Sequence, residues 1–302
     1  MGGDELKLKL LNMLMVANRL NKRPWLPWVL NALKEALFPA RCLLCGSFFE
    51  RTVENEEEQL GLFSKDRSNQ SQFKATLFKE MLSPYICPAC NDRFRPMESP
   101  LCSCCGIMFE SRVGHDHLCA GCLERSRPFR KARAFGVYNQ TLMEAIHCFK
   151  YHAKIQLARP FEILLLSVLL TFWDEDPPDI VVPIPLHAAK FRQRGFNQAF
   201  MMIKDWQVLA VMPAVGLPNI VIERELLVRT RWTEPQTGLG RSMRRQNIKG
   251  AFDIRHKTQV LHKKILLVDD VYTTGATVEE CSAVLLRAGA EWVDVLTLAR
   301  TL

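Results

Sequence analysis

From residue 131 onward, two hydrophobic periods alternate along the chain. Apolar positions at helical spacing occupy 142–170 and 277–289, and a further helix is predicted near 196–211. The strand-like runs are ARAFGVY (132–138), DIVVPI (179–184), residues 220–228, KKILLVDD (263–270) and WVDVLTLA (292–299). Strands that alternate with helices of this length indicate an α/β fold with a mostly parallel sheet covered on both faces.

The N-terminal half lacks this alternation and divides by composition. Residues 1–40 carry apolar and basic residues at roughly helical spacing, which predicts an amphipathic extension packed on the body, with a membrane-surface helix as the alternative. Residues 41–128 are cysteine-rich and contain a polar, acidic insertion at 50–83, expected to be partly disordered. The predicted domains are therefore the extension, this cysteine-rich module and an α/β domain at 129–302.

Four Cys-x-x-Cys pairs lie in the cysteine-rich module. Each pair supplies two corners of a zinc tetrahedron, so four pairs predict two structural zinc ions. Pairing neighbours along the chain closes the shorter loops and is the favoured arrangement, with an interleaved pairing as the alternative. The predicted ligands are Cys42, Cys45, Cys87, Cys90, Cys102, Cys105, Cys119 and Cys122.

Other residues with ligand chemistry are expected off the metal. Cys104, His115 and His117 lie near the later pairs, but four cysteines already complete each tetrahedron. Cys148 and Cys281 fall in helical apolar patterns and are expected in the core. Because a closed four-thiolate site has no open position, the module is expected to be structural and not catalytic.

Composition and charge indicate what kind of partner the protein binds and in which compartment it is found. The 302 residues carry 40 Lys and Arg against 32 Asp and Glu, a net charge of +8 that favours phosphorylated small molecules or nucleic acid. The early residues are acidic where a signal peptide is basic, and the longest apolar run, 163–173, is about half a bilayer crossing. We therefore expect a cytoplasmic protein with reduced thiols and no integral membrane span.

The strongest signal for a binding site is ILLVDDVYTTGAT at 265–277. An apolar run ends in two adjacent acids, Asp269 and Asp270, and a turn rich in Thr and Gly leads into a helix. Ligands of open α/β sheets bind at the carboxyl ends of strands, where such a turn offers backbone N–H groups and a helix dipole to an anion. The segment predicts a cradle for a ribose phosphate. The alternative is an ordinary strand–turn–helix.

This segment resembles the phosphoribosyltransferase signature, and the wider likeness is to the ComF family, also called GntX-like and associated with competence. It covers nearly everything from residue 41 to the end, except the insertion at 50–83. The matching blocks are IHCFKYHAKIQLA (146–158), VVPIPLH (181–187), RQRGFNQA (192–199), RTRWTEPQTGLGRSMRRQNIKGAF (229–252) and VDVLTLARTL (293–302). The resemblance implies a type I phosphoribosyltransferase fold behind a double zinc ribbon, with a role in DNA uptake or use of external DNA.

The resemblance also implies roles for single residues. Asp269 and Asp270 would hold the ribose hydroxyls and, with Arg244, form the catalytic set. The pyrophosphate loop would have an unusual peptide conformation, and Mg²⁺ would bridge ribose hydroxyls and pyrophosphate oxygens. The implied substrate-binding residues are Thr273, Thr274, Gly275, Ala276 and Thr277 at the 5′-phosphate; Pro183, Ile184 and Pro185 in the pyrophosphate loop; Arg194 and Asn197; and Arg229, Gln236, Arg241 and Arg245 in a mobile loop.

Alternatives remain for several of these residues. Arg194 and Asn197 have packing and capping as their other interpretation, and the Arg-rich loop has a solvated basic surface. The expected function is binding of 5-phosphoribosyl pyrophosphate and transfer of the phosphoribosyl group to an unidentified acceptor. Displacing pyrophosphate separates charge, which arginines and Mg²⁺ would stabilise.

Two other functions compete with this one. The first is a non-catalytic competence factor that binds single-stranded DNA with the same fold and acts with other DNA-uptake proteins, although aromatic and basic residues do not interleave regularly along the chain. The second, a salvage enzyme acting on a free base, is disfavoured because the sequence shows no base-recognition element.

Overall fold

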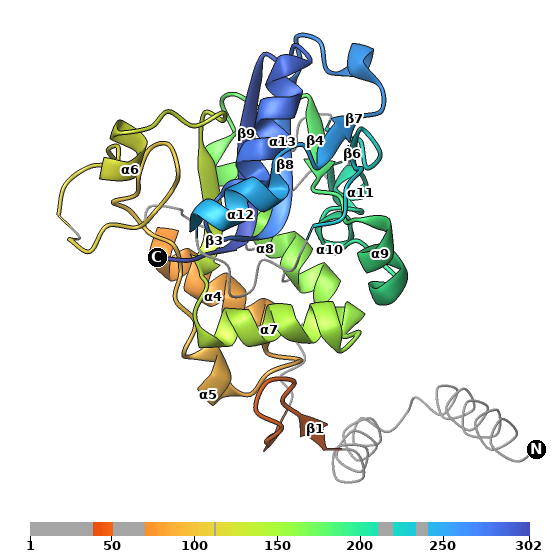
Figure 1. Ribbon diagram of the computed structural model, residues 1–302. Coiled ribbons are helices and arrows are strands. Elements are labelled where there is room, and N and C mark those ends of the chain that lie inside the picture. Colours follow the sequence, from red (N-terminus) through yellow and green to blue (C-terminus); the bar gives the residue numbers. More distant parts are fainter. Residues whose placement is uncertain (1–38, 51–69, 112, 211–219, 234–240) are drawn as a thin grey trace, which may run out of the picture.

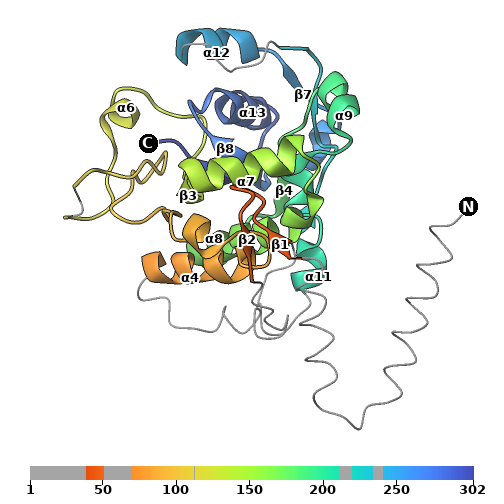
Figure 2. The same ribbon diagram turned by 90° about the horizontal axis from the view of Figure 1, so that it is seen from below.

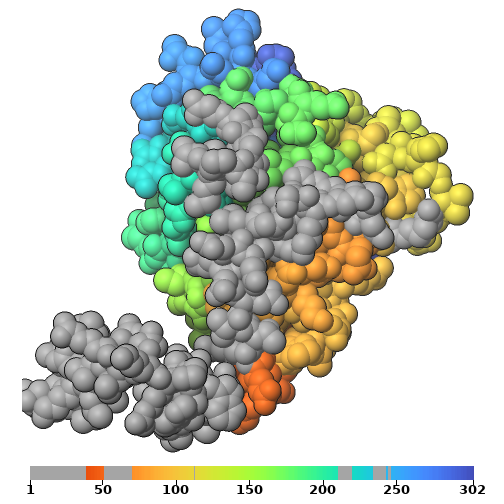
Figure 3. Space-filling model, turned by 180° about the vertical axis from the view of Figure 1, so that it is seen from behind, coloured from red at the N-terminus to blue at the C-terminus, as the bar shows by residue number. Residues whose placement is uncertain are grey.

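The structure is a computed structural model that describes residues 39–50, 70–111, 113–210, 220–233 and 241–302. The amphipathic extension predicted at 1–40 falls almost wholly outside these residues, as does the first part of the predicted polar insertion. Seen from behind, helix α4 and the cysteine-rich segments, orange to yellow, adjoin the green and blue α/β body (Figure 3).

A parallel sheet forms the centre of the described structure (Figure 1). Every neighbouring pair of strands in it runs parallel. In spatial order the strands are β3 (Ala132–Val137), β9 (Trp292–Arg300), β8 (Lys264–Tyr272), β4 (Ile180–Pro183) and β5 (Val221–Ile222). The central strands are buried along most of their length, as is typical of a parallel sheet covered by helices. The predicted α/β fold class is confirmed.

Helices cover both faces of this sheet (Figures 1 and 2). Because successive side chains of a strand point to opposite faces, Leu266 and Val268 pack on one side of β8, and Ile265 and Leu267 pack on the other. The first side is covered by α4 (Gln70–Leu82), α7 (Gln140–Tyr151), η2 (Ile155–Leu157) and α8 (Ala158–Phe172). The second side is covered by α13 (Ala276–Arg287), on which α12 (Arg241–Ile248) packs.

Helix α4 lies where the sequence predicted part of a polar insertion. Its residues Leu77, Phe78, Met81 and Leu82 are buried in the core beside α8. The prediction for 50–83 is therefore corrected over this helix. The apolar positions recur at helical spacing, but the surrounding Gln, Ser and Lys residues outnumber them and obscure the pattern.

A single helix was predicted near 196–211, and residues 188–210 instead contain three short helices, of which the last two lie within the predicted range. Gly195, with a φ of 84°, ends the first of them, and the Asn197 side chain accepts hydrogen bonds from the backbone N–H groups of Ala199 and Phe200 to begin the second. The helices are α9 (Ala188–Arg194), α10 (Gln198–Met201) and α11 (Trp206–Ala210). They lead from β4 to the edge strand β5.

An antiparallel ribbon carries the Arg-rich segment predicted as a loop. Strands β6 (Leu227–Arg229) and β7 (Phe252–Ile254) pair with each other, so the two ends of the Arg-rich segment lie side by side. The last part of this Arg-rich segment forms helix α12, where a loop was predicted. A short helix, η3 (Lys257–Gln259), then leads towards β8.

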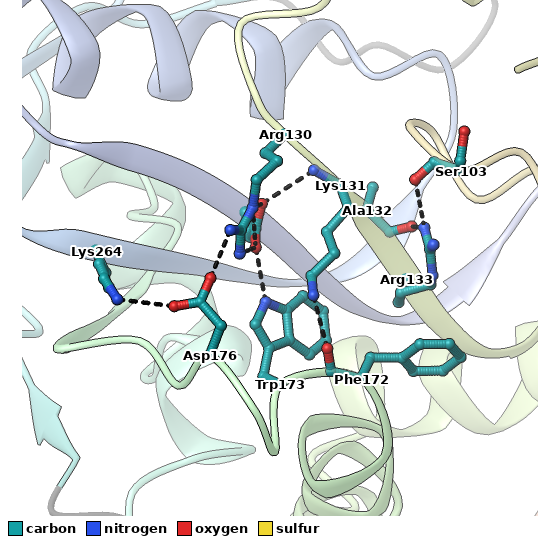
Figure 4. Close-up of polar contacts among 10 residues, drawn as sticks. Ser103, Arg130, Lys131, Ala132, Arg133, Phe172, Trp173, Asp176 and Lys264 are labelled. Carbon is teal, nitrogen blue, oxygen red and sulfur yellow. Dashed lines mark hydrogen bonds and ion pairs between the residues drawn. The ribbon is translucent and has the colours of Figure 1, made fainter.

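The amino end of the sheet is closed by a polar network (Figure 4). Asp294, near the start of β9, is fully buried and accepts hydrogen bonds of 2.7 Å from Arg130 Nη2 and from Trp173 Nε1. Asp176 joins the same arginine to Lys264, whose Nζ lies 2.8 Å away. Because its charges are paired inside the network, this end of the sheet is structural, and the opposite end remains for a ligand.

One helical stretch within the described ranges, Ile155–Phe172, is long and apolar enough to cross a membrane by length and composition. In the structure, 72% of it is buried. It contacts β3 and β9, so it packs as a core helix against the sheet.

Candidate functional site

Two acids and three cations meet at the carboxyl end of β8. Lys150, from α7, forms an ion pair with Asp270, whose side chain is only 6% exposed. Burial raises the pKa of Asp269 to about 6, while the charges of Lys150, Arg229 and Arg194 oppose that rise. The predicted residues Asp269, Asp270, Arg194 and Arg229 are thus brought together from β8, α9 and β6.

The cations of this cluster are themselves partly desolvated. Burial lowers the pKa of Lys150 to about 8, and the charge of Asp269 opposes the change. Burial also lowers the pKa of Arg194 and of Arg229, again opposed by Asp269. Lys190, on α9, has a pKa lowered first by burial and then by the charges of Arg229 and Arg194. Positive charge exceeds negative charge here, which suits a polyanionic ligand.

Lys150 and Lys190 were not among the residues singled out from the sequence. The signal for Lys150 was present, because it stands four residues after the core residue Ile146 on a helix face otherwise formed by apolar side chains. A lysine on a buried face needs a nearby acid, but the partner lies 120 residues away and only the fold reveals it.

Residues 272–277, called the phosphate corner below, follow the acids. Gly275 has a φ of 81° and is the N-cap of α13, which begins without a side-chain cap. The hydroxyl of Thr274 accepts a hydrogen bond of 3.5 Å from the backbone N–H of Ala276. Thr273, Thr274 and Thr277 are half-buried at the surface. A helix start without a side-chain cap, preceded by a left-handed glycine, is suited to receive an anion.

The predicted pyrophosphate loop runs from the end of β4 beside the acids. The backbone N–H of Ile184 donates to the carbonyl of Val268, at 2.9 Å, and Asn197 Nδ2 donates to the carbonyl of Ile184, at 3.1 Å. Asn197 therefore holds the loop to α10 while it caps that helix, which is the capping role named as its alternative. Pro183 and Pro185 are buried. The peptide bonds of this loop are trans, so the unusual conformation implied by the resemblance does not occur as a cis bond.

The remaining predicted residues lie on the Arg-rich segment between β6 and β7. Arg229, on β6, donates to the hydroxyl of Thr233, and its guanidinium lies 5.4 Å from the centre of the Phe252 ring. Gln236 lies outside the described residues. So do the side chains of Arg241, Arg244 and Arg245, although their backbone belongs to α12.

A cavity of about 720 Å³ adjoins the predicted pyrophosphate loop. It opens between α9, α10 and β6, and its walls combine Phe191, Phe196 and Phe200 with Arg192 and Arg229. Aromatic rings beside guanidinium groups can receive a flat anionic molecule.

The cysteine pairs form two tetrads, each with its sulfur atoms within 4.8 Å of one another. The first comprises Cys42, Cys45, Cys87 and Cys90, and the second comprises Cys102, Cys105, Cys119 and Cys122. Two Sγ–Sγ distances are 3.6 Å, between Cys45 and Cys87, and 3.7 Å, between Cys105 and Cys119. Thiolates bound tetrahedrally to zinc lie roughly 3.8 Å apart, so both tetrads fit such an ion. The pairing of neighbours along the chain is the one expected.

Local structure explains how each tetrad forms. Gly46 and Gly106, both with positive φ, donate their backbone N–H groups to the carbonyls of Cys42 and Cys102, which closes a tight turn around the first pair of each tetrad. The elements of this region are β1 (Ala40–Arg41), β2 (Phe48–Phe49), α5 (Pro88–Asn91) and α6 (Ala120–Leu123).

Three nearby residues with ligand chemistry lie outside the tetrads. Cys104 Sγ lies 4.0 Å from the carbonyl of Phe129, and His117 stacks on Phe109 with ring centres 4.0 Å apart. His115 is exposed. None of the three belongs to either group of candidate ligands.

Comparison with known proteins gives three informative relatives. The chain is 32% identical over 221 residues to the DNA utilization protein YhgH of Salmonella typhi, covering 72% of this chain and 91% of that protein. It is 28% identical over 222 residues to competence protein F of Haemophilus influenzae, with coverages of 71% and 90%. It is 27% identical over 260 residues to competence protein ComFC of Streptococcus pneumoniae, with coverages of 86% and 100%. No protein-family model matches the chain.

Among solved structures, the chain is similar to the glutamine phosphoribosylpyrophosphate amidotransferase from B. subtilis complexed with ADP and GMP. The sequence identity is 20% and the TM-score is 0.28, over 47% of this chain. The overlap is 27% of the amidotransferase, which is a much longer protein.

Proposed function

The chain belongs to the ComF family of competence and DNA-utilization proteins, and we propose that its α/β domain binds 5-phosphoribosyl pyrophosphate with Mg²⁺ and transfers the phosphoribosyl group to an acceptor. The observation that carries the proposal is the placement of Asp269 and Asp270, surrounded by cations, directly before the phosphate corner. Acids suit the hydroxyl side of the sugar, and the uncapped helix start suits its phosphate.

Each part of the site would act on a different part of the ligand. Asp269 and Asp270 would accept hydrogen bonds from the ribose hydroxyls and orient the ring. The phosphate corner would hold the 5′-phosphate through backbone N–H groups and the hydroxyls of its threonines. The pyrophosphate would lie beside the loop at 183–186, where Arg194 and Arg229 would stabilise the negative charge that grows as it leaves.

The acid pair fits a magnesium ion, because Mg²⁺ prefers carboxylate oxygens combined with substrate phosphates. When bound, the ion would be held by Asp269 and Asp270 and would neutralise negative charge on the pyrophosphate. Lys150 forms an ion pair with Asp270 in the structure. We propose that its ammonium group is the counter-charge of this acid when no metal ion is bound.

For the cysteine tetrads we propose structural Zn²⁺, one ion in each. Four thiolates leave no open coordination position, so neither ion takes part in the chemistry. We propose that the chain has a zinc module at 41–128 ahead of the α/β domain at 129–302. Helix α4 packs on α8 and, with Ile86 and Phe94, joins the module to the core of the α/β body.

The names of the relatives suggest the setting for this activity. We propose a role in competence or in the use of external DNA, together with other DNA-uptake proteins, in the cytoplasm. The acceptor of the phosphoribosyl group would be found in that context.

The test of the enzymatic proposal is pyrophosphate release, measured with and without Mg²⁺ across candidate acceptors. We expect Mg²⁺-dependent release with at least one acceptor, lost when Asp269→Asn and Asp270→Asn are combined. Asp176→Asn serves as the control, because that acid lies at the amino end of the sheet. Release that persists in the double variant would overturn the proposal.

A second candidate is single-stranded DNA binding by the same face. Tyr151, Phe191 and Trp232 are 65%, 48% and 42% exposed. Arg194 lies 5.2 Å from the centre of the Tyr151 ring, and Lys190 lies 5.8 Å from the centre of the Trp232 ring. The fold thus brings together aromatic and basic residues that do not interleave along the sequence, and such surfaces stack bases and pair phosphates.

This candidate is separated from the first by its dependence on salt and on the acids. DNA binding that falls steeply with salt, survives the double Asn variant and is lost in Phe191→Ala with Trp232→Ala would favour it. Binding that requires the acid pair would favour the sugar pyrophosphate instead.

A further inference from the structure

The second cysteine tetrad lies against the residues that support the phosphate corner. Arg300, at the end of β9, points Nη2 at the sulfur of Cys105, at 3.4 Å. The same guanidinium lies over the ring of Tyr272, 4.0 Å from its centre. One side chain therefore joins a predicted metal ligand to the first residue of the phosphate corner.

Tyr272 in turn determines the shape of that corner. A Cβ added to Gly275 would lie 2.4 Å from the Tyr272 hydroxyl oxygen, so the phenol ring lies directly against the glycine. Thr301, next to Arg300, donates its backbone N–H to the carbonyl of Tyr272 at 3.1 Å and its hydroxyl to the carbonyl of Thr273 at 3.3 Å. The end of β9 thus holds the start of the corner by side chain and backbone together.

A second connection reaches the other end of the corner. Arg127 and Arg125, just after the last cysteine of the tetrad, both form ion pairs with Glu279 in the first turn of α13. Arg127 Nη2 also donates to the carbonyl of Gly121, between Cys119 and Cys122, at 3.4 Å. The tetrad therefore contacts both the strand that enters the corner and the helix that leaves it.

The body of the tetrad is also fixed to the sheet. The backbone N–H of Ala132, the first residue of β3, donates to the carbonyl of Cys104 at 2.7 Å. Arg133 Nη1 donates to the carbonyl of Ser103 at 3.1 Å (Figure 4). A Cβ on Gly106 would lie 2.3 Å from the carbonyl oxygen of Ala132, so this backbone approach needs glycine. The turn between Cys102 and Cys105 cannot shift without disturbing β3.

Charge explains why the metal matters to Arg300. The side chain belongs to a residue only 6% exposed, and its Nε and Nη1 atoms have no hydrogen-bond partner among the described residues. A buried guanidinium needs a counter-charge. Four thiolates with one divalent ion carry a net charge of −2, whereas four protonated thiols carry none. A metal-loaded tetrad would therefore supply the counter-charge for Arg300 at the place where it lies over Tyr272.

We infer that the metal of the second tetrad holds the phosphate corner in its binding shape, with Arg300, Tyr272 and Arg127 as positioning residues. Loss of that metal frees Arg300 from Cys105, loosens Tyr272 against Gly275 and weakens the hold on the phosphate. The consequence for the ligand rests on the proposed function, but the coupling between tetrad and corner does not.

The first tetrad provides the matched control. There Arg93 Nη2 donates to the sulfur of Cys90 at 3.0 Å, an arginine–sulfur contact like that of Arg300. Cys148, on α7, donates its thiol to the carbonyl of Leu43 at 3.2 Å. These contacts lead to the end of α5 and to α7, and not to the phosphate corner.

The test measures hydrogen–deuterium exchange of the peptide covering 272–279 in the full-length, zinc-loaded protein. Arg300→Met keeps all eight cysteines of the two tetrads, so we expect two zinc ions per chain and exchange at least tenfold faster in this peptide, with Arg300→Lys restoring part of the protection. Arg93→Met should leave the peptide as protected as in the wild type. Unchanged exchange in Arg300→Met, or equal acceleration in Arg93→Met, overturns the inference.

Removal of the metal itself is tested with one cysteine variant in each tetrad. Cys122→Ser should lower the zinc content by one ion and accelerate exchange at 272–279. Cys45→Ser should lower the zinc content equally without that effect. Calorimetric titration with 5-phosphoribosyl pyrophosphate then separates the two proposals. If exchange at 272–279 is accelerated only by loss of the second tetrad's metal, and the wild type does not bind this ligand, then the proposed function is rejected and the coupling is retained. Binding by the wild type with exchange independent of the tetrad rejects the coupling alone.

Discussion

Lys150, in the last turn of α7, forms an ion pair with Asp270, near the end of β8, and both side chains are largely buried. The two residues are 120 positions apart in the sequence. Their ion pair puts the ammonium group of Lys150 at the place where, in the proposed complex, the sugar hydroxyls and a metal ion would lie. The same lysine also lies close enough to Asp269 to oppose the rise in the pKa of that acid.

Replacing Lys150 tests its role as counter-charge. Lys150→Met leaves the buried Asp270 and the half-buried Asp269 short of a cation, and we expect a loss of about 3 kcal/mol in the free energy of unfolding. The pKa of Asp269 should rise further above 6, because the largest opposing charge is gone. Urea unfolding and carboxyl NMR titration measure both effects. Lys150→Arg is the control and should retain most of both properties. A Met variant as stable as the wild type would contradict this role.

The raised pKa of Asp269 predicts an unusual pH dependence of stability. Its pKa is about 6 in the folded protein, whereas an unperturbed aspartate, as in the unfolded chain, has a pKa of 3.8. Between these values the folded state holds a proton that the unfolded state has lost, so stability falls as pH rises through this window. We expect a difference on the order of 2 kcal/mol between wild type and Asp269→Asn to develop from pH 4 to pH 6.5, with the variant the more stable at neutral pH. Unfolding curves at several pH values measure it, and parallel profiles would refute the assignment.

Ligand binding should run in the opposite direction over the same pH range. An ionised Asp269 accepts hydrogen bonds from hydroxyls and binds Mg²⁺, so affinity for 5-phosphoribosyl pyrophosphate should increase as pH rises through about 6. Titrations at pH 5, 6 and 7 measure the trend, and a flat profile in the wild type would exclude Asp269 from the site.

Gly275 is the most exacting position of the phosphate corner. Gly275→Ala adds a methyl group 2.4 Å from the Tyr272 hydroxyl at a φ of 81°. We expect a loss of about 1–3 kcal/mol in stability and at least tenfold weaker phosphate binding. Gly46→Ala is the matched control, since its φ is 75° and nothing lies within 4 Å of the added atom. Equal phosphate affinity in the two variants would show that the corner does not hold the ligand.

Cys104 and Cys105 are neighbours in the sequence, but only Cys105 is a candidate zinc ligand. Cys105 belongs to the second tetrad and Cys104 does not. Cys105→Ser should reduce the zinc content from two ions to one, whereas Cys104→Ser should keep both. Elemental analysis of the purified proteins decides the matter, and loss of zinc from the Cys104 variant would mean that the tetrad is wrongly composed.

The sequence predicted the sheet, the acid pair and both tetrads because each has a local signature. Apolar runs predict strands wherever the packing partner is a helix, and Cys-x-x-Cys turns are defined within a few residues. Arg300 and Glu279 had no such signature. Their partners, Cys105 and Arg127, lie more than 150 residues away, and only the fold brings them together.

Helix α4 is an element that the hydrophobic pattern of the sequence did not predict. Phe78 and Leu82 are fully buried, but Lys74 lies on the same buried face, where its ammonium group donates to the carbonyl of Met97 at 2.7 Å. Burial lowers the pKa of this lysine to about 7. A buried lysine interrupts the apolar period, so the helix resembles a polar insertion until its partner is known.

The most direct test of the central claim is calorimetric titration of the zinc-loaded protein with 5-phosphoribosyl pyrophosphate in the presence of Mg²⁺. We expect one ligand per chain, at least tenfold tighter binding with Mg²⁺ than without it, and loss of that binding in Asp269→Asn combined with Asp270→Asn. No heat of binding in the wild type, or the same affinity in the double variant, would contradict the account.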